Sequence, residues 1–178
     1  MPDPLNVPQL QTERLILRGA SRMDFPAIAA LWADADVTRY IHRAPLTEEE
    51  AWAKFMRGFG HWALCGYGFW TVQEKASGRA IGEVGFLDAK RSIAPALDGT
   101  PEVGWVLARA AWGQGYATEA LKAALSWGDA HLDQRRFACL IAPENSASLR
   151  VAAKAGFREG ARTSYKGEPT ILLYREAP

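Results

Sequence analysis

The feature that most constrains this chain lies near its middle, where a buried-strand pattern leads into a glycine-rich loop and a helix start. Val103 to Leu107 is strongly apolar, and a short connector then leads to Trp112-Gly113-Gln114-Gly115-Tyr116-Ala117-Thr118-Glu119-Ala120. Two glycines separated by one residue allow the backbone to turn tightly and present several N–H groups in succession. The helix that follows adds unsatisfied N–H groups and the positive end of its dipole. The stretch therefore predicts an anion site suited to a pyrophosphate.

Two common nucleotide-binding loops do not fit this stretch. A dinucleotide fold needs Gly-x-Gly-x-x-Gly after an N-terminal strand, whereas the third position here is Thr118. A P-loop ends in Gly-Lys-Ser/Thr, which the stretch lacks. The loop alone leaves open a plain strand–turn–helix, in which the glycines only form the turn and bind no ligand.

The stretch resembles the acyl-coenzyme-A loop of the GNAT N-acetyltransferases, whose pattern is Arg/Gln-x-x-Gly-x-Gly/Ala. Trp112 stands where Arg or Gln is usual, and this departure resembles the RimJ/RimL branch, with its Trp-Gly-x-Gly-Tyr-Ala-Thr-Glu-Ala loop. The resemblance implies that acetyl-CoA is the co-substrate. The cofactor-binding residues that it implies in and before the loop are Val106, Leu107, Trp112, Gly113, Gln114, Gly115, Tyr116, Ala117 and Thr118.

A second motif lies downstream, where Asn145-x-x-Ser148 is followed by Lys154-Ala155-Gly156-Phe157. The simplest interpretation is that Asn145 caps a helix and Gly156 ends it, with Ser148 facing solvent. The motif also resembles the same acetyltransferase branch, which implies that Asn145 binds the pantetheine arm. Ser148 would then bind the cofactor as well, and donate a proton to the leaving thiolate.

Acetyl transfer to an amine needs a neutral amine, a stabilised oxyanion and a thiolate that can leave. Two carboxylates are candidates for accepting the amine proton. Strand alternation places Glu102 on one face with Gly104 and Val106. Glu102 also matches the glutamate before the loop in the resembled family, so it ranks first and Glu83 second. An ion pair or an edge-strand charge remains open for both, and a backbone N–H near Leu107 is the expected oxyanion donor.

The GNAT resemblance implies an α/β (α+β) fold in which helices flank a mixed, mostly antiparallel sheet of six to seven strands, and the hydrophobic periodicity predicts where its elements lie. Strand patterns cover 12–18, 69–74, 80–87, 101–107, 136–141, 158–165 and 169–175. Helix patterns cover 48–64, 116–132 and 146–155, and another helix follows Ser21 or Asp24. In the first of these helices Trp52, Phe55, Met56 and Phe59 are expected to be buried.

Composition limits the remaining possibilities. The 178 residues are expected to form a single domain, 1–178, and the formal net charge of +1 favours neither nucleic acid nor a membrane surface as a partner. Cys65 and Cys139 show no paired spacing, which is typical of reduced thiols in a cytoplasmic protein. No metal site is expected, because the three histidines are scattered.

The function that these patterns favour is N-acetylation of a primary amine by acetyl-CoA. The RimJ/RimL resemblance suggests a protein N-terminal amine as acceptor. A small-molecule amine, such as an antibiotic or a polyamine, remains open, as does a non-catalytic acyl-CoA-binding sensor. The sequence is compatible with a monomer or a homodimer.

Overall fold

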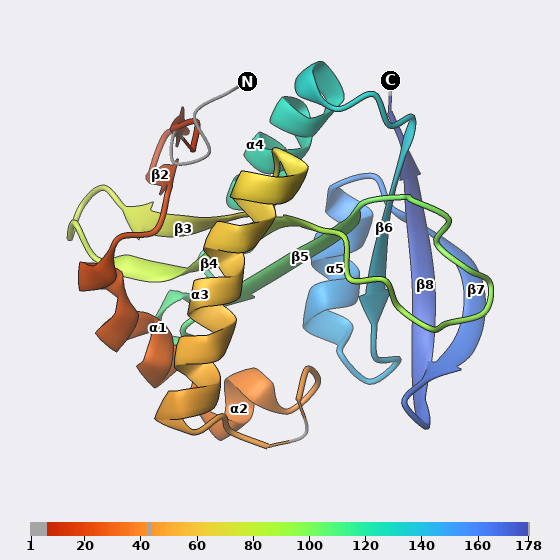
Figure 1. The fold of residues 1–178 in the computed structure, drawn as a ribbon, viewed down its shortest axis with the longest axis horizontal. Helices are drawn as coiled ribbons and strands as arrows, with labels where there is room; N and C mark the ends of the chain where they lie inside the picture. Colours follow the sequence, from red (N-terminus) through yellow and green to blue (C-terminus); the bar gives the residue numbers. More distant parts are fainter. Residues whose placement is uncertain (1–6, 43, 178) are drawn as a thin grey trace.

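The computed structural model describes residues 7–42 and 44–177, in which eight strands form one open sheet (Figure 1). The order across the sheet is β1-β2-β3-β4-β5-β6-β8-β7, and every neighbouring pair is antiparallel except β5 and β6. The strands are β1 (Leu10–Gln11), β2 (Leu15–Arg18), β3 (Phe69–Glu74), β4 (Ala80–Leu87), β5 (Glu102–Leu107), β6 (Arg136–Ile141), β7 (Arg158–Tyr165) and β8 (Glu168–Glu176).

Helices cover both faces of this sheet. One face carries α1 (Phe25–Trp32), α2 (Ala35–Thr38) and α3 (Glu48–Cys65), whose apolar residues pack together with Val106 of β5. The other carries α4 (Tyr116–His131) and α5 (Ser146–Lys154). Two short 3₁₀ turns, η1 (Arg22–Asp24) and η2 (Arg109–Ala111), precede α1 and α4. In the described part of the chain no helix is both long and apolar enough to cross a membrane.

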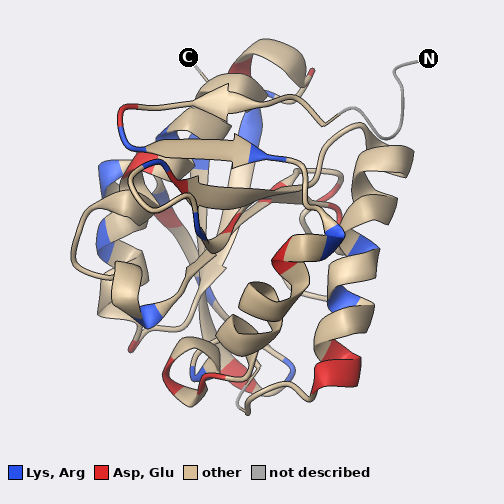
Figure 2. Cartoon of the chain, turned by 90° about the vertical axis from the view of Figure 1, so that its left-hand side faces the viewer, with Lys and Arg blue, Asp and Glu red and all other residues tan. Residues whose placement is uncertain are grey.

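The start of α3 shows how local sequence fixes a helix. Thr47 and Glu50 form a reciprocal capping box, in which the Glu50 N–H donates to Thr47 Oγ1 over 3.3 Å and the Thr47 N–H donates to Glu50 Oε2 over 2.8 Å. Figure 2 shows the acidic first turn of α3 in red, where negative charge suits the positive end of the helix dipole. The predicted start at Glu48 is confirmed.

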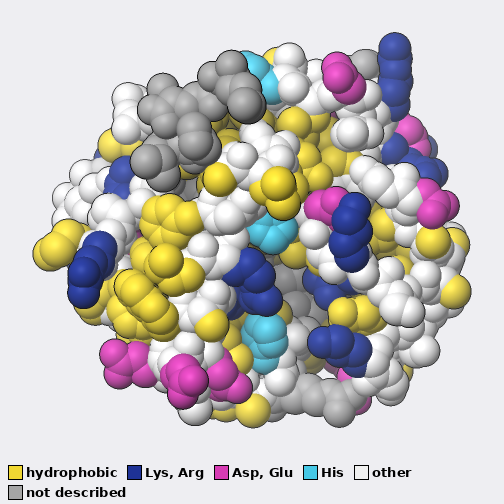
Figure 3. All heavy atoms as spheres, in the orientation of Figure 1, with side chains coloured by type: hydrophobic (Ala, Val, Ile, Leu, Met, Phe, Trp, Pro, Cys, Tyr) yellow, Lys and Arg dark blue, Asp and Glu magenta, His cyan; other side chains and the backbone are white. Residues whose placement is uncertain are grey.

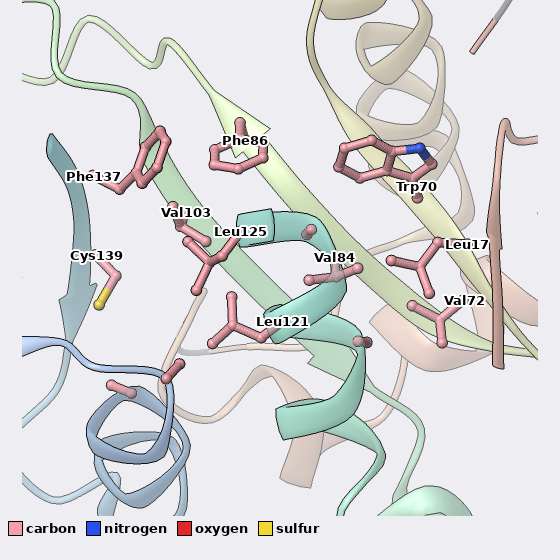
Figure 4. Packing of buried hydrophobic residues seen from close by; sticks show 14 of the residues in the cluster. Leu17, Trp70, Val72, Val84, Phe86, Val103, Leu121, Leu125, Phe137 and Cys139 are labelled. Atoms are coloured by element: carbon pink, nitrogen blue, oxygen red, sulfur yellow. The ribbon is translucent and has the colours of Figure 1, made fainter. Parts of the chain in front are cut away.

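The larger core lies between the sheet and α4. Figure 4 shows Leu121 and Leu125 of α4 against Val84, Phe86 and Val103 of the central strands, all of them buried. Small residues on the inner side of α4 allow this close packing. At Gly128 a Cβ atom would lie only 2.6 Å from the Phe86 ring, so the helix could not approach as closely with a larger residue.

The structure corrects two expectations. The mixed, mostly antiparallel sheet is confirmed, but it has eight strands in the described residues rather than six to seven, because the N-terminal lead adds the short β1 beside β2. Within α3, Trp52 and Met56 are not buried, with 38% and 49% of their surface exposed. The buried side of α3 carries Ala51, Phe55 and Trp62 instead. Trp52 and Met56 each come one position after a buried residue, which places them at the edge of that side.

The two central strands separate soon after they begin. Their parallel ladder contains one residue pair, Glu102 with Ala138, whereas β5 is paired with β4 along its whole length. Beyond Glu102 the two strands diverge towards their carboxyl ends. This divergence is the feature of the fold that positions the site.

Candidate active site

Backbone groups of β5 line the divergence from β6. The Ala108 N–H donates to the Ile81 carbonyl over 2.9 Å, so alternate residues of β5 bond to β4. The same alternation directs the N–H and C=O groups of Trp105 and Leu107 towards the diverging β6. The Leu107 carbonyl accepts a hydrogen bond from Trp112 Nε1 over 2.7 Å. The Leu107 N–H therefore faces the divergence as a donor, and its role as the oxyanion donor stays a prediction.

The glycine-rich loop lies directly beyond the end of β5. Gly113 and Gly115 have φ angles of 74° and 80°, which L-residues with side chains adopt with strain. Gly115 is the N-cap of α4, and no side chain caps that helix start. A Cβ atom at Gly113 would meet no atom within 4 Å, whereas one at Gly115 would lie 3.4 Å from Arg14 Nη2, so the loop surface is open at Gly113. Ala117 and Thr118 belong to the first turn, whose N–H groups no side chain caps, as the predicted anion site requires.

Contacts from the N-terminal segment hold this loop in place. Arg14 Nη1 donates to the Gln114 carbonyl over 2.9 Å, and Arg14 Nε donates to Glu119 Oε2 over 2.7 Å. The Thr12 hydroxyl donates to Glu119 Oε1 over 2.6 Å. With its carbonyl held by Arg14, Gln114 is fixed in orientation within the loop. The sequence reasoning missed Arg14, because its partners lie a hundred or more residues away in the chain.

Two aromatic residues of the predicted cofactor set differ in placement. The Tyr116 side chain is buried, and its hydroxyl donates to Glu74 Oε1 over 2.7 Å, so only its backbone N–H is turned to the loop surface. Trp112 is 48% exposed, although its indole N–H is bound to Leu107. Trp112 thus offers an indole surface to a ligand, whereas Tyr116 anchors the helix to β3.

Asn145 and Ser148 lie at the start of α5. Asn145 Oδ1 accepts a hydrogen bond from the Ser148 N–H over 3.1 Å, so the predicted helix cap is confirmed. Both residues are half-buried. Because the cap uses only the amide oxygen of Asn145 and the backbone of Ser148, the Asn145 amide nitrogen and the Ser148 hydroxyl remain as donors.

The two candidate carboxylates lie on the same face of the sheet but in different surroundings. Glu102 is buried, and Arg91 donates to both of its oxygens, with Nη2 at 2.6 Å from Oε1. The Arg91 guanidinium also lies over the Tyr165 ring, 4.8 Å from its centroid. Both oxygens of Glu102 are therefore engaged in a buried bidentate ion pair, and breaking such a pair is costly.

Glu83 lies opposite Val106 in the ladder, beside the end of β5 that leads to the loop. Glu83 Oε2 accepts a hydrogen bond from Trp32 Nε1 over 3.0 Å, and the Lys54 ammonium lies over the same indole, 4.3 Å from its ring centroid. Burial raises the pKa of Glu83, while the Lys54 charge and the Trp32 hydrogen bond oppose this rise. A carboxylate with a raised pKa and no bidentate partner is suited to accepting a proton.

The thiol of Cys139 is buried within β6. Burial raises the pKa of the Cys139 thiol strongly, and the Glu102 charge adds to this effect, so Cys139 is not available as a thiolate nucleophile. Among residues 7–42 and 44–177 no cluster of His, Cys, Asp and Glu could hold a metal ion.

Arg14→Gln is expected to weaken binding of CoA about 10-fold or more, because the loop loses the cation that fixes the Gln114 carbonyl. Calorimetry on the variant would measure this change. Arg162→Gln is the matched control, since Arg162 pairs only with Glu159 at the far edge of the sheet among its described contacts. Equal CoA affinity in the Arg14 variant and the parent would show that the loop holds its shape without Arg14.

Comparison with known proteins identifies the class to which this fold and site belong. The family model described as "Acetyltransferase (GNAT) domain" matches residues 14–158, so the chain belongs to the GNAT family of acetyl-CoA-dependent acetyltransferases. A putative GNAT-family acetyltransferase from Bordetella pertussis is 34% identical to it and superimposes with a TM-score of 0.84, covering 95% of this chain and 99% of that one.

Two more distant structures share the fold. RimL, a ribosomal alpha-N-protein acetyltransferase solved with coenzyme A, has a TM-score of 0.78 at 18% identity, covering 95% of this chain and 98% of that chain. Spermidine N-acetyltransferase from Vibrio cholerae, solved with CoA and spermine, has a TM-score of 0.74 at 18% identity, covering 93% and 97% respectively. At this level of identity they establish the fold and leave the acceptor of the present chain open.

Proposed function

We propose that this protein transfers an acetyl group from acetyl-CoA to a primary amine, with the pyrophosphate held by residues 113–118 and the pantetheine arm between β5 and β6. The observation that carries this proposal is the divergence of β5 and β6 directly before a loop of two left-handed glycines and an uncapped helix start. The open loop surface and the free donors of Asn145 and Leu107 fit the phosphate and amide oxygens of such a co-substrate.

The side chains divide the chemistry between them. Transfer forms an N–C bond and breaks a C–S bond, so the amine gives up one proton and the departing sulfur gains one. We assign the first proton to Glu83 in preference to Glu102, because Arg91 occupies both oxygens of Glu102. The Leu107 N–H stabilises negative charge on the carbonyl oxygen, and the Ser148 hydroxyl supplies the proton to sulfur.

The acceptor is an amine of a peptide N-terminus or of a small molecule. Among proteins of this fold, RimL is described as acting on a ribosomal protein and another as acting on spermidine. The RimJ/RimL-like loop favours the N-terminal amine of a protein. We infer a cytoplasmic enzyme that needs neither nucleic acid nor a membrane as partner.

Turnover separates an enzyme from a non-catalytic acyl-CoA sensor. Purified protein with acetyl-CoA is expected to release free thiol only when an amine is added, and a panel that sets N-terminal peptides against small amines would identify the acceptor type. Tight binding of acetyl-CoA without thiol release for any amine would favour the sensor and contradict the enzymatic proposal.

Asn145→Ala and Ser148→Ala are expected to affect different steps. Asn145→Ala should weaken CoA binding, because it removes the amide donor that faces the pantetheine arm. Ser148→Ala should leave binding close to normal and slow turnover by ~10²-fold, if its hydroxyl supplies the proton. Calorimetry and single-turnover kinetics on both variants would separate these effects. An unchanged chemical step in Ser148→Ala would rule out the acid role.

A further inference from the structure

Basic side chains border the face of β4 and β5 that carries Glu83. Lys54 and Arg57 lie three residues apart on α3 and so share a side of that helix. His42 follows α2, with its ring 5.4 Å from that of Trp32. Figure 3 shows Lys, Arg and His side chains gathered in the middle of this face, between α3 and the strands β7 and β8.

Electrostatic effects indicate that these groups lie within each other's field. Burial lowers the pKa of His42, and the charges of Lys54, Arg57 and Lys166 lower it further. Burial also lowers the pKa of Lys54, with Arg57 and Arg91 adding to the effect, while Glu83 and Glu102 oppose it. Cations from α3, from the segment before β5 and from the β7–β8 turn therefore act on His42 or Lys54, and Lys54 in turn acts on Glu83.

The carboxylates near Lys54 and Arg57 are largely engaged by other residues. Glu102 is taken by Arg91, and Glu50 is tied to Thr47 at the start of α3. Glu83 remains beside Lys54, bound to the Trp32 indole over which the Lys54 ammonium lies. Among the described residues, no carboxylate forms a salt bridge with the Arg57 guanidinium.

We propose that Lys54 and Arg57 form an anion subsite beside Glu83, so that the acceptor is an amine that also carries a carboxylate. This inference rests on the proposed function, since it names the class of amine that the enzyme acetylates. The carboxylate pairs with the cations of α3, while the amine is directed to Glu83. A polyamine or other polycation would bring a second ammonium group against these like charges and is disfavoured.

The same cations assist the chemistry. An amine attacks only through its neutral form, and nearby positive charges disfavour its protonated form, which lowers the pKa of the bound amine. The amine proton passes to Glu83, the amine nitrogen bonds to the acetyl carbon, and the electron pair of the broken C–S bond stays on sulfur. The acceptor carboxylate compensates the cations that Glu83 alone does not neutralise.

Two matched series of amines test the subsite. γ-Aminobutyrate, its amide and putrescine have the same carbon chain and differ in charge at the far end. Ala-Glu-amide, Ala-Gln-amide and Ala-Lys-amide repeat this comparison for a peptide N-terminus. In the series that contains the better acceptor, kcat/KM is expected to fall from carboxylate to amide to ammonium, by about 10-fold at each step at low salt. Added salt should narrow the differences.

A matched pair of variants tests whether α3 causes the preference. Arg57→Gln should lower kcat/KM for the carboxylate member towards that for the amide, and raise it for the ammonium member. Lys122→Gln, on the exposed side of α4, removes the same charge elsewhere and should preserve the order. Turnover with no preference for the carboxylate, or a preference for putrescine or the lysine peptide, would overturn the subsite alone. Absence of turnover with every amine would overturn the proposed function and the subsite together.

Discussion

Glu83→Gln is expected to lower kcat/KM by ~10²–10⁴-fold at neutral pH, which is the usual contribution of a general base. Gln keeps the shape and hydrogen-bond acceptor of the side chain, so Trp32 retains its partner. The variant loses proton acceptance together with the carboxylate charge beside Lys54. Steady-state kinetics with the best amine of the panel would measure the loss. CoA affinity should change little, because Glu83 lies on the face of the sheet that packs against α1 and α3, and the helix after the glycine-rich loop packs on the other face.

The activities of the parent and of Glu83→Gln should depend differently on pH. A base works only when deprotonated, and burial raises the pKa of Glu83, so the parent should lose activity as pH falls through a value above the ordinary range of glutamate. In Glu83→Gln solvent hydroxide replaces the base, and the defect should shrink as pH rises. Lys54→Met should move the acid limb to higher pH, because the Lys54 charge lowers the pKa of Glu83.

Glu102→Gln is the internal comparison for Glu83→Gln. It leaves the Arg91 guanidinium without its carboxylate, so it should lower the thermal midpoint more than Glu83→Gln does. Its kinetic defect should be smaller and nearly independent of pH. If Glu102→Gln carries the large, pH-dependent loss and Glu83→Gln does not, the base is Glu102, as the sequence pattern alone favoured.

Gly115→Val is expected to abolish measurable CoA binding. The φ angle of 80° suits glycine and strains a β-branched residue, and the new side chain would also block the approach of a phosphate to the first turn of α4. Calorimetric titration of the folded variant with CoA would measure the affinity. Circular dichroism would first establish that the variant is folded.

Gly167→Val separates backbone strain from loss of the site. Gly167 has a φ angle of 81° in the β7–β8 turn, and a Cβ atom there would meet no atom within 4 Å. Its substitution by valine imposes a similar strain away from the glycine-rich loop, so it should lower stability comparably and leave CoA affinity intact. Normal CoA affinity in a folded Gly115→Val variant would place the pyrophosphate elsewhere.

Much of the fold could be predicted because its causes are local. The capping box of Thr47 and Glu50 starts α3, and Asn145 caps α5, each through contacts three residues apart. The two glycines of the loop indicate positive φ angles at their own positions, because residues with side chains rarely adopt positive φ. Alternation of apolar residues set most strand positions and placed Glu102 and Val106 on the same face.

Only the tertiary structure gave the two candidate carboxylates different partners. The sequence ranked Glu102 above Glu83, whereas the fold occupies Glu102 with Arg91 and brings Trp32 and Lys54 to Glu83 from distant helices. Two other features also depend on residues far apart in the chain. They are the hydrogen bond from Arg14 to the glycine-rich loop and the divergence of β5 from β6. Hydrophobic periodicity and helix capping depend only on residues close together in the chain. The ionisation and the accessibility of a side chain depend on groups that folding brings from distant parts of the chain.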